Sequence, residues 1–143
     1  MTTTDFFDTS WLVAAWEAPE NGQANAHSLR VWNTRRKGSA IAAHTLAEIF
    51  HYFTGRREQY PGAFVEKLEQ NLEGVTVVAL TSTEYWSVLA RAKATGVEGR
   101  AIYDALLLAA ARKCAASAIW TRNETAWRNY APDLAGRIHG LQD

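Results

Sequence analysis

Short apolar segments alternate with helix-length segments along the chain, and this alternation is the feature that most constrains its fold. The clearest strand candidate is Val75 to Leu80, which is β-branched and apolar. Other candidates are Asp5 to Thr9, Ser39 to Ala43, Ser117 to Trp120 and a last strand near Arg137 to His139. Because strands that alternate with helices are typical of crossover connections, the sequence predicts an α/β fold with a mostly parallel central sheet.

The segments between these strands have the start and stop signals of helices. Pro61 opens one of them, and Gly74 and Gly96 follow the ends of two. Gly55 ends another, and a turn is expected at Pro19 to Gly22. The sequence predicts helices over Ser10–Glu17, Gln23–Arg36, Thr45–Thr54, Pro61–Leu72, Ser82–Thr95 and Ala101–Ala116, and a short one around Trp127.

Length and composition fit one domain spanning residues 1–143. The formal net charge is +0 at pH 7, so contacts with nucleic acid must come from local basic clusters. Cys114 is the only cysteine, which excludes an internal disulfide and favours a reducing compartment. No apolar run is long enough to span a membrane and no signal segment opens the chain, so we expect a cytoplasmic protein. The six tryptophans are scattered and are expected to pack in the core and at interfaces.

Three carboxylates stand at positions that solubility alone does not require. Asp8 ends the first predicted strand, and Glu48 lies in the first turn of the helix after the second. Asp104 is the only charged residue between Ala101 and Ala111, where an unpaired charge costs free energy. Ligands of open parallel sheets bind beyond the carboxyl ends of the strands. Carboxylates gathered there repel one another and favour a hard divalent cation such as Mg²⁺, which prefers oxygen ligands.

Each acid also has a purely structural interpretation. Asp8 and Asp104 fit acids that interact with a helix dipole, and Thr45 to Glu48 fits a capping box. The histidines do not have the spacing of a zinc site, because they are dispersed over His27, His44, His51 and His139.

Four segments resemble the PIN-domain family, and they occur in the order in which that family has them. Phe7-Asp8-Thr9-Ser10 is similar to the opening of PIN domains, and Leu46-Ala47-Glu48-Ile49 is similar to the segment with their second acid. Ile102-Tyr103-Asp104-Ala105-Leu106 resembles their Tyr-Asp-Ala helix. Thr121-Arg122-Asn123 resembles the turn that is common in VapC-like toxins. The resemblance implies a three-layer fold with about five strands in a central, mostly parallel sheet flanked by helices.

The same resemblance implies a metal-dependent active site. Asp8, Glu48 and Asp104 are expected to bind Mg²⁺, or Mn²⁺, and to be catalytic together with Asn123. The substrate contacts implied are Arg122, Ser10 and Thr121, with Ser10 also able to support Asp8.

This chain departs from the family's pattern at the fourth acidic position. Many PIN domains have an aspartate where Asn123 stands, and many VapC-like toxins have one three residues later, where this chain has Ala126 followed by Trp127 in place of the usual phenylalanine. Asn123 is able to orient a metal-bound water without charge, and Glu124 is the alternative for this position.

The function implied is that of a Mg²⁺-dependent endoribonuclease, the toxin of a VapBC-like toxin–antitoxin pair. Its implied partners are an RNA substrate, a small cognate antitoxin and a second copy of the chain. Candidate phosphate contacts are the basic clusters Arg35-Arg36-Lys37 and Arg56-Arg57, in addition to Arg122. Apolar residues for an interface are Trp11, Trp16, Phe50 and Phe53, which core packing explains equally well.

Other functions agree less well with the residues. The missing fourth acid motivates one alternative, a catalytically weak PIN-like module that binds RNA or a partner. A receiver domain requires adjacent acids after the first strand and a lysine after a late strand, and the chain has neither. A phosphatase of the haloacid-dehalogenase type requires an Asp-x-Asp motif, which Asp8-Thr9-Ser10 lacks.

Overall fold

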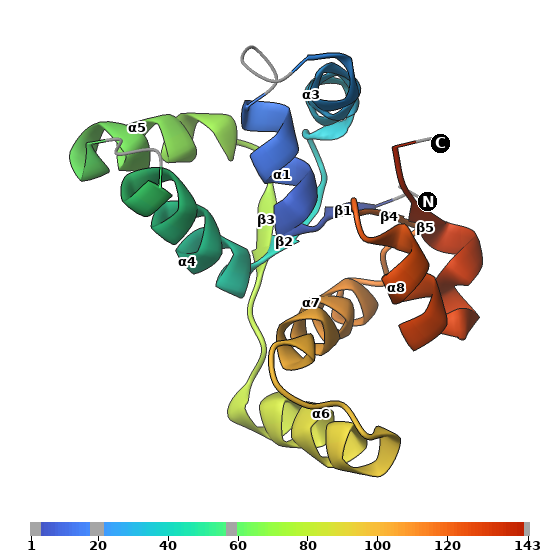
Figure 1. Cartoon of the computed structure of the whole chain (residues 1–143). Coiled ribbons are helices and arrows are strands. Elements are labelled where there is room, and N and C mark those ends of the chain that lie inside the picture. The colour runs from blue at the N-terminus through green and yellow to red at the C-terminus, as the bar shows by residue number, and fades with distance from the viewer. Residues whose placement is uncertain (1–3, 18–21, 57–59, 142–143) are drawn as a thin grey trace.

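The computed structural model describes residues 4–17, 22–56 and 60–141, and its centre is a five-stranded sheet (Figure 1). The strands are β1 (Asp5–Phe7), β2 (Ala40–Ala42), β3 (Thr76–Val78), β4 (Ala118–Trp120) and β5 (Ile138–His139). Their order is β3-β2-β1-β4-β5, and every neighbouring pair is parallel. The predicted fold class is therefore confirmed, with all five expected strands present and each shorter than the sequence suggested.

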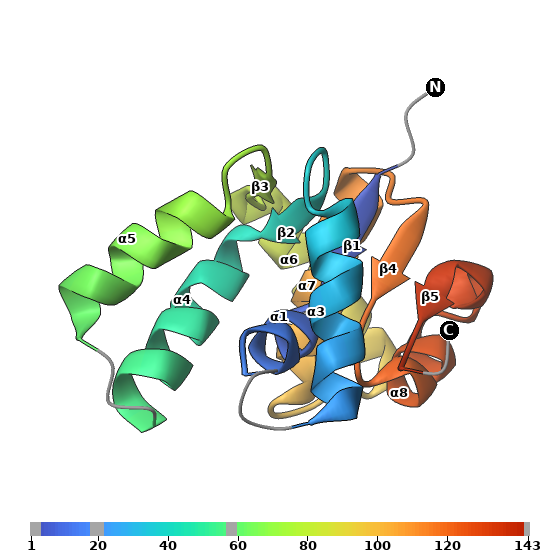
Figure 2. The same ribbon diagram turned by 90° about the horizontal axis from the view of Figure 1, so that it is seen from above.

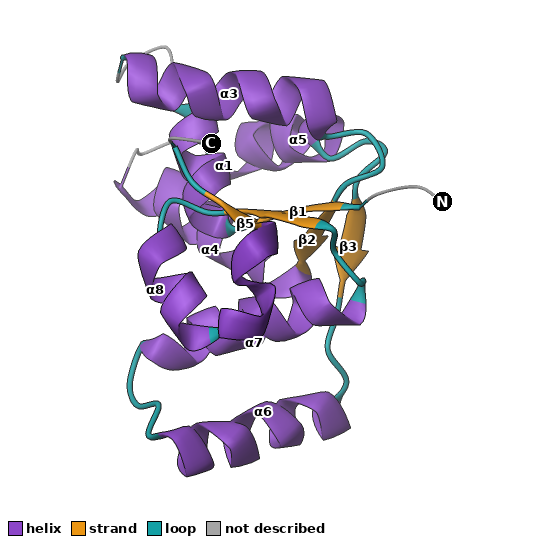
Figure 3. Ribbon diagram, turned by 90° about the vertical axis from the view of Figure 1, so that its right-hand side faces the viewer, coloured by secondary structure: helices purple, strands orange, loops and turns teal. Residues whose placement is uncertain are grey.

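Helices connect the strands and cover both faces of the sheet (Figure 3). In chain order they are α1 (Thr9–Trp16), α3 (Gln23–Arg35), α4 (Ala43–His51) with a π-helical turn η1 (Tyr52–Arg56), α5 (Pro61–Asn71), α6 (Ser82–Thr95), α7 (Ala101–Lys113), α8 (Glu124–Tyr130) and a 3-10 turn η2 (Pro132–Arg137). The expected turn at residues 19–21 lies outside the described part of the chain.

Successive side chains along each strand point to opposite faces of the sheet, and the interior is therefore divided into two clusters. Phe7 and Ile41 face α1, α3, α4 and α5, whose apolar side chains form one cluster with them. Phe6, the residue before Phe7, faces the opposite side, where α7, α8 and η2 form the other cluster. Figure 2 shows α3 and α1 lying across the middle strands. The two clusters fix both faces of the sheet and leave its carboxyl edge available for polar side chains.

The start of α4 differs from the predicted one. The helix begins at Ala43, two residues before Thr45, so Glu48 lies in its second turn. The expected capping box is absent because the cap residue is Ala42 and makes no side-chain capping bond. Thr45 and Glu48 instead face Thr9 of α1. Gly55 does not end α4 either, since it lies inside the π-helical turn.

Helix α6 is the outermost element of the fold and packs against α7 (Figures 1 and 3). It begins with a complete capping box between Thr81 and Glu84, which the sequence analysis did not identify. Ala92 is its only buried residue, and Trp86 is 71% exposed, so this tryptophan is not part of the core. In the described ranges, no helix combines the length and the apolar character needed to cross a bilayer.

Candidate active site

The carboxyl edge of the sheet brings the predicted site residues toward one another from different elements. Asp8 directly follows β1 and is the cap residue of α1. Glu48 is on α4, which follows β2 without a loop, and Asp104 is on α7. Thr121 directly follows β4, the neighbour of β1. Because all strands are parallel, the residues that follow β1, β2 and β4 meet at this one edge.

Two hydroxyl groups hold the Asp8 carboxylate, which is 2% exposed. Ser10 donates to Asp8 Oδ2 over 2.5 Å, and Thr121 donates to the same oxygen over 2.8 Å. The hydroxyls themselves accept backbone N–H groups, that of Arg122 on Ser10 over 3.1 Å and that of Asn123 on Thr121 over 3.0 Å. In the described part of the chain Asp8 Oδ1 accepts no hydrogen bond, so one oxygen is fixed and the other is left for a ligand.

The electrostatic environment of Asp8 disfavours its charge. The pKa of Asp8 is raised to about 6, chiefly by burial; the nearby carboxylates of Asp104 and Glu48 contribute to this increase, and the hydrogen bonds from Ser10 and Thr121 oppose it. Within the described ranges, no lysine or arginine side chain forms an ion pair with Asp8, Glu48 or Asp104. The negative charge of this group of acids is therefore not neutralised by a described lysine or arginine.

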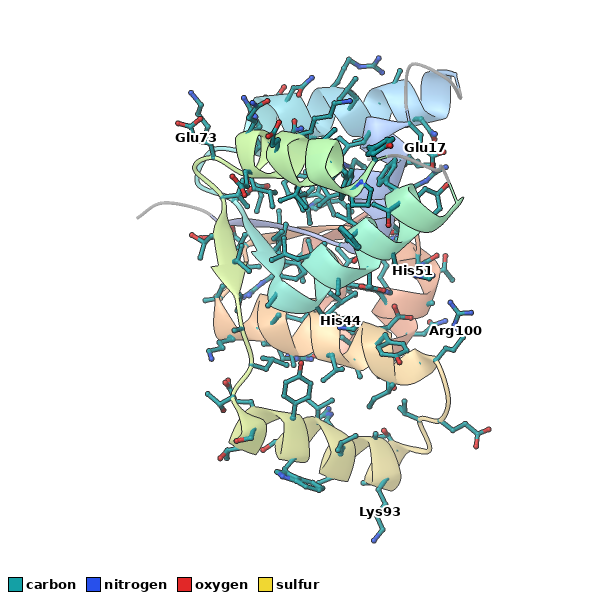
Figure 4. All side chains as sticks on the ribbon, turned by 90° about the vertical axis from the view of Figure 1, so that its left-hand side faces the viewer. Glu17, His44, His51, Glu73, Lys93 and Arg100 are labelled. Atoms are coloured by element: carbon teal, nitrogen blue, oxygen red, sulfur yellow. The ribbon has the colours of Figure 1, made fainter. Side chains whose placement is uncertain are left out.

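Glu48 is positioned by a threonine from the neighbouring helix. The hydroxyl of Thr9 donates to Glu48 Oε1 over 2.8 Å and lies 2.9 Å from the hydroxyl of Thr45. His44, one turn earlier on α4, places its Nε2 3.9 Å from the same carboxylate oxygen. The His44 ring stacks on Tyr103 of α7, with centroids 5.1 Å apart and planes 7° apart. Figure 4 shows His44 on the side of α4 that faces α7.

Asp104 is half-buried on α7 and lies close to α8. Burial raises the pKa of Asp104, as does the charge of Glu48, whereas the indole N–H of Trp127 lowers it. That N–H does not complete a hydrogen bond in the structure, because Trp127 Nε1 is buried without a partner. The charge of Asp104 in turn contributes to raising the pKa of Tyr130, after burial. Asp104 thus interacts electrostatically with Asp8, Glu48 and α8.

The donor set of this edge fits a hard divalent cation. All three acids offer carboxylate oxygens, the charges of Asp104 and Glu48 contribute to raising the pKa of Asp8, and no described lysine or arginine pairs with them. In the positions that the described residues occupy, no three Asp, Glu, His or Cys side chains enclose a metal ion. Mg²⁺ is compatible with such a set, because this ion keeps several of its waters and needs direct contact with only one or two carboxylates.

The fourth position of the site, for which Asn123 and Glu124 are the candidates, is not occupied by an aspartate. Asn123 is exposed, and as the cap residue of α8 it makes no side-chain capping bond. Glu124 packs its carboxylate against Gly140, the residue that follows β5, where an added Cβ would stand 2.3 Å from Glu124 Cδ. Both Asn123 and Glu124 therefore lie near the carboxyl ends of β4 and β5, and both stay candidates for this position.

The predicted basic residues are not all near the acids. Arg122 lies beside them, with its guanidinium donating to Asn25 of α3 over 2.9 Å. The Arg35-Arg36-Lys37 cluster precedes β2 and is therefore at the opposite edge of the sheet. There Arg35 pairs with Asp5 at 3.3 Å and lies over the Trp120 ring. Arg57 and the side chain of Arg56 fall outside the described part of the chain.

Core packing also decides the predicted interface residues. Trp11 and Phe53 are buried in the cluster under α1, α3, α4 and α5, so neither is available on the surface. Trp16 is partly buried against the same cluster, and Phe50 is 39% exposed. Of the four, only Phe50 remains a surface residue.

Sequence reasoning missed the contributions of Thr9, His44 and Trp127 to this edge. Thr9 was a visible neighbour of Asp8, but its bond to Glu48 joins residues 39 positions apart. His44 was considered only as a metal ligand, and its i,i+4 spacing to Glu48 was the available signal. For Trp127 the signal was a polar N–H at a position where the family has an apolar ring.

Comparison with known proteins agrees with this fold. The sequence model of the PIN domain matches residues 6–131. No curated protein sequence gives a match. A solved toxin–antitoxin complex from Klebsiella pneumoniae is 16% identical over 96% of this chain and 97% of its own, with a TM-score of 0.63.

Two further solved structures have a similar fold. VapC20 from Mycobacterium tuberculosis, a toxin that cleaves the sarcin-ricin loop, is 18% identical over 80% of this chain and 86% of its own, with a TM-score of 0.64. VapBC2 from Rickettsia felis, bound to a DNA fragment of its promoter, is 16% identical over 96% and 98%, with a TM-score of 0.65. The match to the domain model covers most of the chain, including Asp8, Glu48 and Asp104, and the chain therefore belongs to the PIN domain family.

Proposed function

We propose that this protein is a Mg²⁺- or Mn²⁺-dependent endoribonuclease and the toxin of a VapBC-like toxin–antitoxin pair. The observation that carries the proposal is the group of three carboxylates at the carboxyl edge of the sheet, which no described lysine or arginine neutralises. A PIN-domain fold shared with a toxin that cleaves the sarcin-ricin loop supports the choice of RNA as substrate. The proposed site of action is the cytoplasm, where such substrates occur.

In this proposal Asp8, Glu48 and Asp104 hold the cation. The cation, when bound, lowers the pKa of the attacking water and stabilises the negative charge that develops on the phosphate. Ser10 and Thr121 keep Asp8 oriented through Oδ2, so that Oδ1 remains available. Thr9 does the same for Glu48 through Oε1. In-line attack by water leaves a 5′-phosphate and a 3′-hydroxyl.

Residues of the loop after β4 contact the substrate in this proposal. Arg122 provides a positive charge beside the acids, and the Asn123 side chain, which is exposed, orients the attacking water. Ser10 and Thr121 add hydroxyls at the same place. Since phosphate contacts release counterions, cleavage should become less efficient as the salt concentration rises, and Arg122→Gln should reduce that salt dependence. An unchanged salt dependence in this variant would remove Arg122 from the site.

The residue at position 126 favours one second function. With Ala126 at the usual place of the fourth acid, Asp8, Glu48 and Asp104 are the acids that this proposal assigns to the site. A catalytically weak PIN-like module that binds RNA or a partner would have such a site. Binding of Mn²⁺ and RNA without turnover would establish this alternative, whereas multiple turnover would exclude it.

The test is cleavage of RNA by the purified protein with Mg²⁺ or Mn²⁺, followed by sequencing of the new 5′ ends. We expect cleavage by the wild type that EDTA abolishes and that Asp104→Asn lacks. Glu84→Gln is the matched control, because it also removes one carboxylate charge but lies on α6 away from the site. Full activity of Asp104→Asn, or equal loss in both variants, would contradict the assignment.

The proposed partners are tested in cells. Expression of the wild type should generate new RNA 5′ ends and arrest growth, and Asp8→Asn should do neither. Co-expression of the small protein encoded beside the gene should restore growth if it is the antitoxin. Sedimentation of the purified protein, alone and with that partner, tests the expected homodimer. Identical RNA profiles for the wild type and Asp8→Asn would end the nuclease proposal.

A further inference from the structure

Trp127 of α8 combines complete burial with an unused polar group. The side chain is 0% exposed, and its Nε1–H has no hydrogen-bond partner among the described residues. A buried N–H without a partner loses its hydration and recovers nothing in exchange. The volume of the indole is accounted for by packing in the cluster, but a phenylalanine ring would pack there without this polar cost, so the unused N–H is the feature that packing does not require.

The surroundings of Trp127 connect it to the acidic edge. It packs in the cluster that contains Leu107 and Leu108, which lie one turn after Asp104 on α7. The Asp104 carboxylate is near enough for the indole N–H to lower its pKa, although the hydrogen bond is not completed. The cluster therefore presents a desolvated donor beside a carboxylate that needs an orienting partner.

We propose that the indole N–H of Trp127 is the positioning donor of Asp104, completing its hydrogen bond to one carboxylate oxygen when a divalent cation engages the other. The inference rests on the proposed function of the site. It assigns Trp127 no contact with the substrate or with the reacting atoms, so Trp127 is a positioning residue.

A neutral donor has an advantage over a lysine or arginine at this place. A cationic side chain would hold Asp104 but would also repel the divalent ion and reduce its affinity. The indole N–H orients the carboxylate and adds no positive charge. The indole N–H also cannot accept a hydrogen bond, so it interacts only with an acceptor such as a carboxylate oxygen. In this respect Trp127 does for Asp104 what Ser10 and Thr121 do for Asp8.

The first test observes the hydrogen bond itself. In the ¹H–¹⁵N spectrum of the full chain, the indole signal of Trp127 is assigned by its loss in Trp127→Phe. It should shift when Mg²⁺ is added and in Asp104→Ala. Trp32 is an internal control, because its Nε1 is equally buried and without a partner but belongs to the other cluster. A Trp127 signal that responds no more than that of Trp32 would overturn the proposal.

The second test measures the consequence for the site. Trp127→Phe should weaken Mn²⁺ binding, followed by titration calorimetry, by about 10- to 100-fold, as is common when an outer partner of a metal ligand is removed. Trp32→Phe, which makes the same change in the other cluster, should bind Mn²⁺ like the wild type. Wild-type affinity in a folded Trp127→Phe variant would contradict the proposal.

The two proposals fail in different ways. If the wild type cleaves no RNA but the Trp127 signal depends on Asp104, the nuclease proposal fails and the hydrogen bond stands. If the wild type cleaves RNA and the Trp127 signal is insensitive to Asp104, the role of Trp127 fails and the nuclease proposal stands. The spectrum of the wild type decides the hydrogen bond even if Trp127→Phe folds poorly.

Discussion

Carboxylates occur in two opposite environments in this molecule. On the side of α6 and α7, Glu84 accepts hydrogen bonds from Lys113 Nζ over 2.6 Å and from the Thr81 backbone N–H over 2.8 Å. These bonds lower the pKa of Glu84 to about 2, with the bond from Lys113 having the larger effect. At the carboxyl edge of the sheet, burial raises the pKa of Asp8 to about 6, and its charged neighbours are acids.

The charge of Glu84 is balanced by a residue of the same chain, whereas the charge of Asp8 is available for a ligand. Glu84 is partly exposed and is paired with Lys113 within the chain, so its charge is balanced without an external ion. Asp8 is buried, and its hydroxyl partners orient it without neutralising it. The buried charge of Asp8 lowers the free energy of unfolding at neutral pH, and binding of an external cation would restore it. The following predictions test whether the two environments differ as described.

The largest expected effect is on catalysis. Asp8→Asn keeps the shape of the side chain but removes its charge, and it should slow RNA cleavage by about 1000-fold, since metal catalysis contributes several kcal/mol to the barrier. Asp133→Asn removes a charge that Arg112 pairs on the surface at 2.6 Å, and it should leave cleavage unchanged. The rates are compared at saturating Mn²⁺. Equal losses in the two variants would erase the proposed distinction.

The next effect is on stability without metal. Because the pKa of Asp8 in the folded chain lies above its unfolded value of 3.8, this carboxyl contributes stability below about pH 4 and loses it as the pH rises through about 6. The loss amounts to about 3 kcal/mol when complete. In urea unfolding with EDTA, Asp8→Asn should therefore be more stable than the wild type at pH 7.5 and similar to it at pH 4. A wild type that is the more stable protein at pH 7.5 would contradict this sign.

A smaller effect is expected from the hydroxyl groups that orient Asp8. Thr121→Val keeps the shape of this fully buried side chain and removes its hydrogen bond to Asp8 Oδ2. Cleavage and Mn²⁺ affinity should decrease by about 10- to 100-fold, and Thr121→Ser should restore most of both. Failure of the serine variant to restore them would assign Thr121 to packing.

The smallest effect is expected on the paired side. Glu84→Gln removes the ion pair to Lys113, whereas the glutamine amide oxygen can still accept the Thr81 N–H of the capping box of α6. Its thermal midpoint should be slightly lower than that of the wild type at pH 7, since exposed ion pairs contribute little. Because the folded pKa of Glu84 is lowered, the difference should disappear as the pH falls toward 2. A destabilisation as large at pH 2 as at pH 7 would show that the ion pair is not its cause.

Local segments were sufficient to predict the fold and the elements on which Asp8, Glu48 and Asp104 lie. The Phe7-Asp8-Thr9 segment predicts that Asp8 stands where β1 ends and α1 begins, and the structure has it there. Apolar runs and turn residues were sufficient to locate every strand, because each strand is a short apolar segment followed by the start of a helix or a turn. The remaining differences are shifts of helix ends, such as Ala43 for Thr45, where a tertiary contact replaced the expected local cap.

Interactions between distant parts of the chain could not be predicted in this way. The basic cluster at Arg35 had the composition of a phosphate site, but Asp5, 30 positions away, pairs with it at the opposite edge of the sheet. The Glu124 carboxylate packs against Gly140, 16 positions away, a contact that no local pattern indicates. Each of these depends on which strands are neighbours, and a local pattern carries no information on that order.

The hydrogen bonds around Asp8 also have a direction. The amides of Arg122 and Asn123 donate to Ser10 and Thr121, and these hydroxyls donate to Asp8, so every proton along the two paths points toward the carboxylate. Such aligned chains polarise one another. A cation that arrives at Asp8 therefore changes the electron density at two peptide groups that it does not touch. Metal binding at Asp8 is therefore coupled to the amides of Arg122 and Asn123, which belong to the loop that is proposed to contact the RNA.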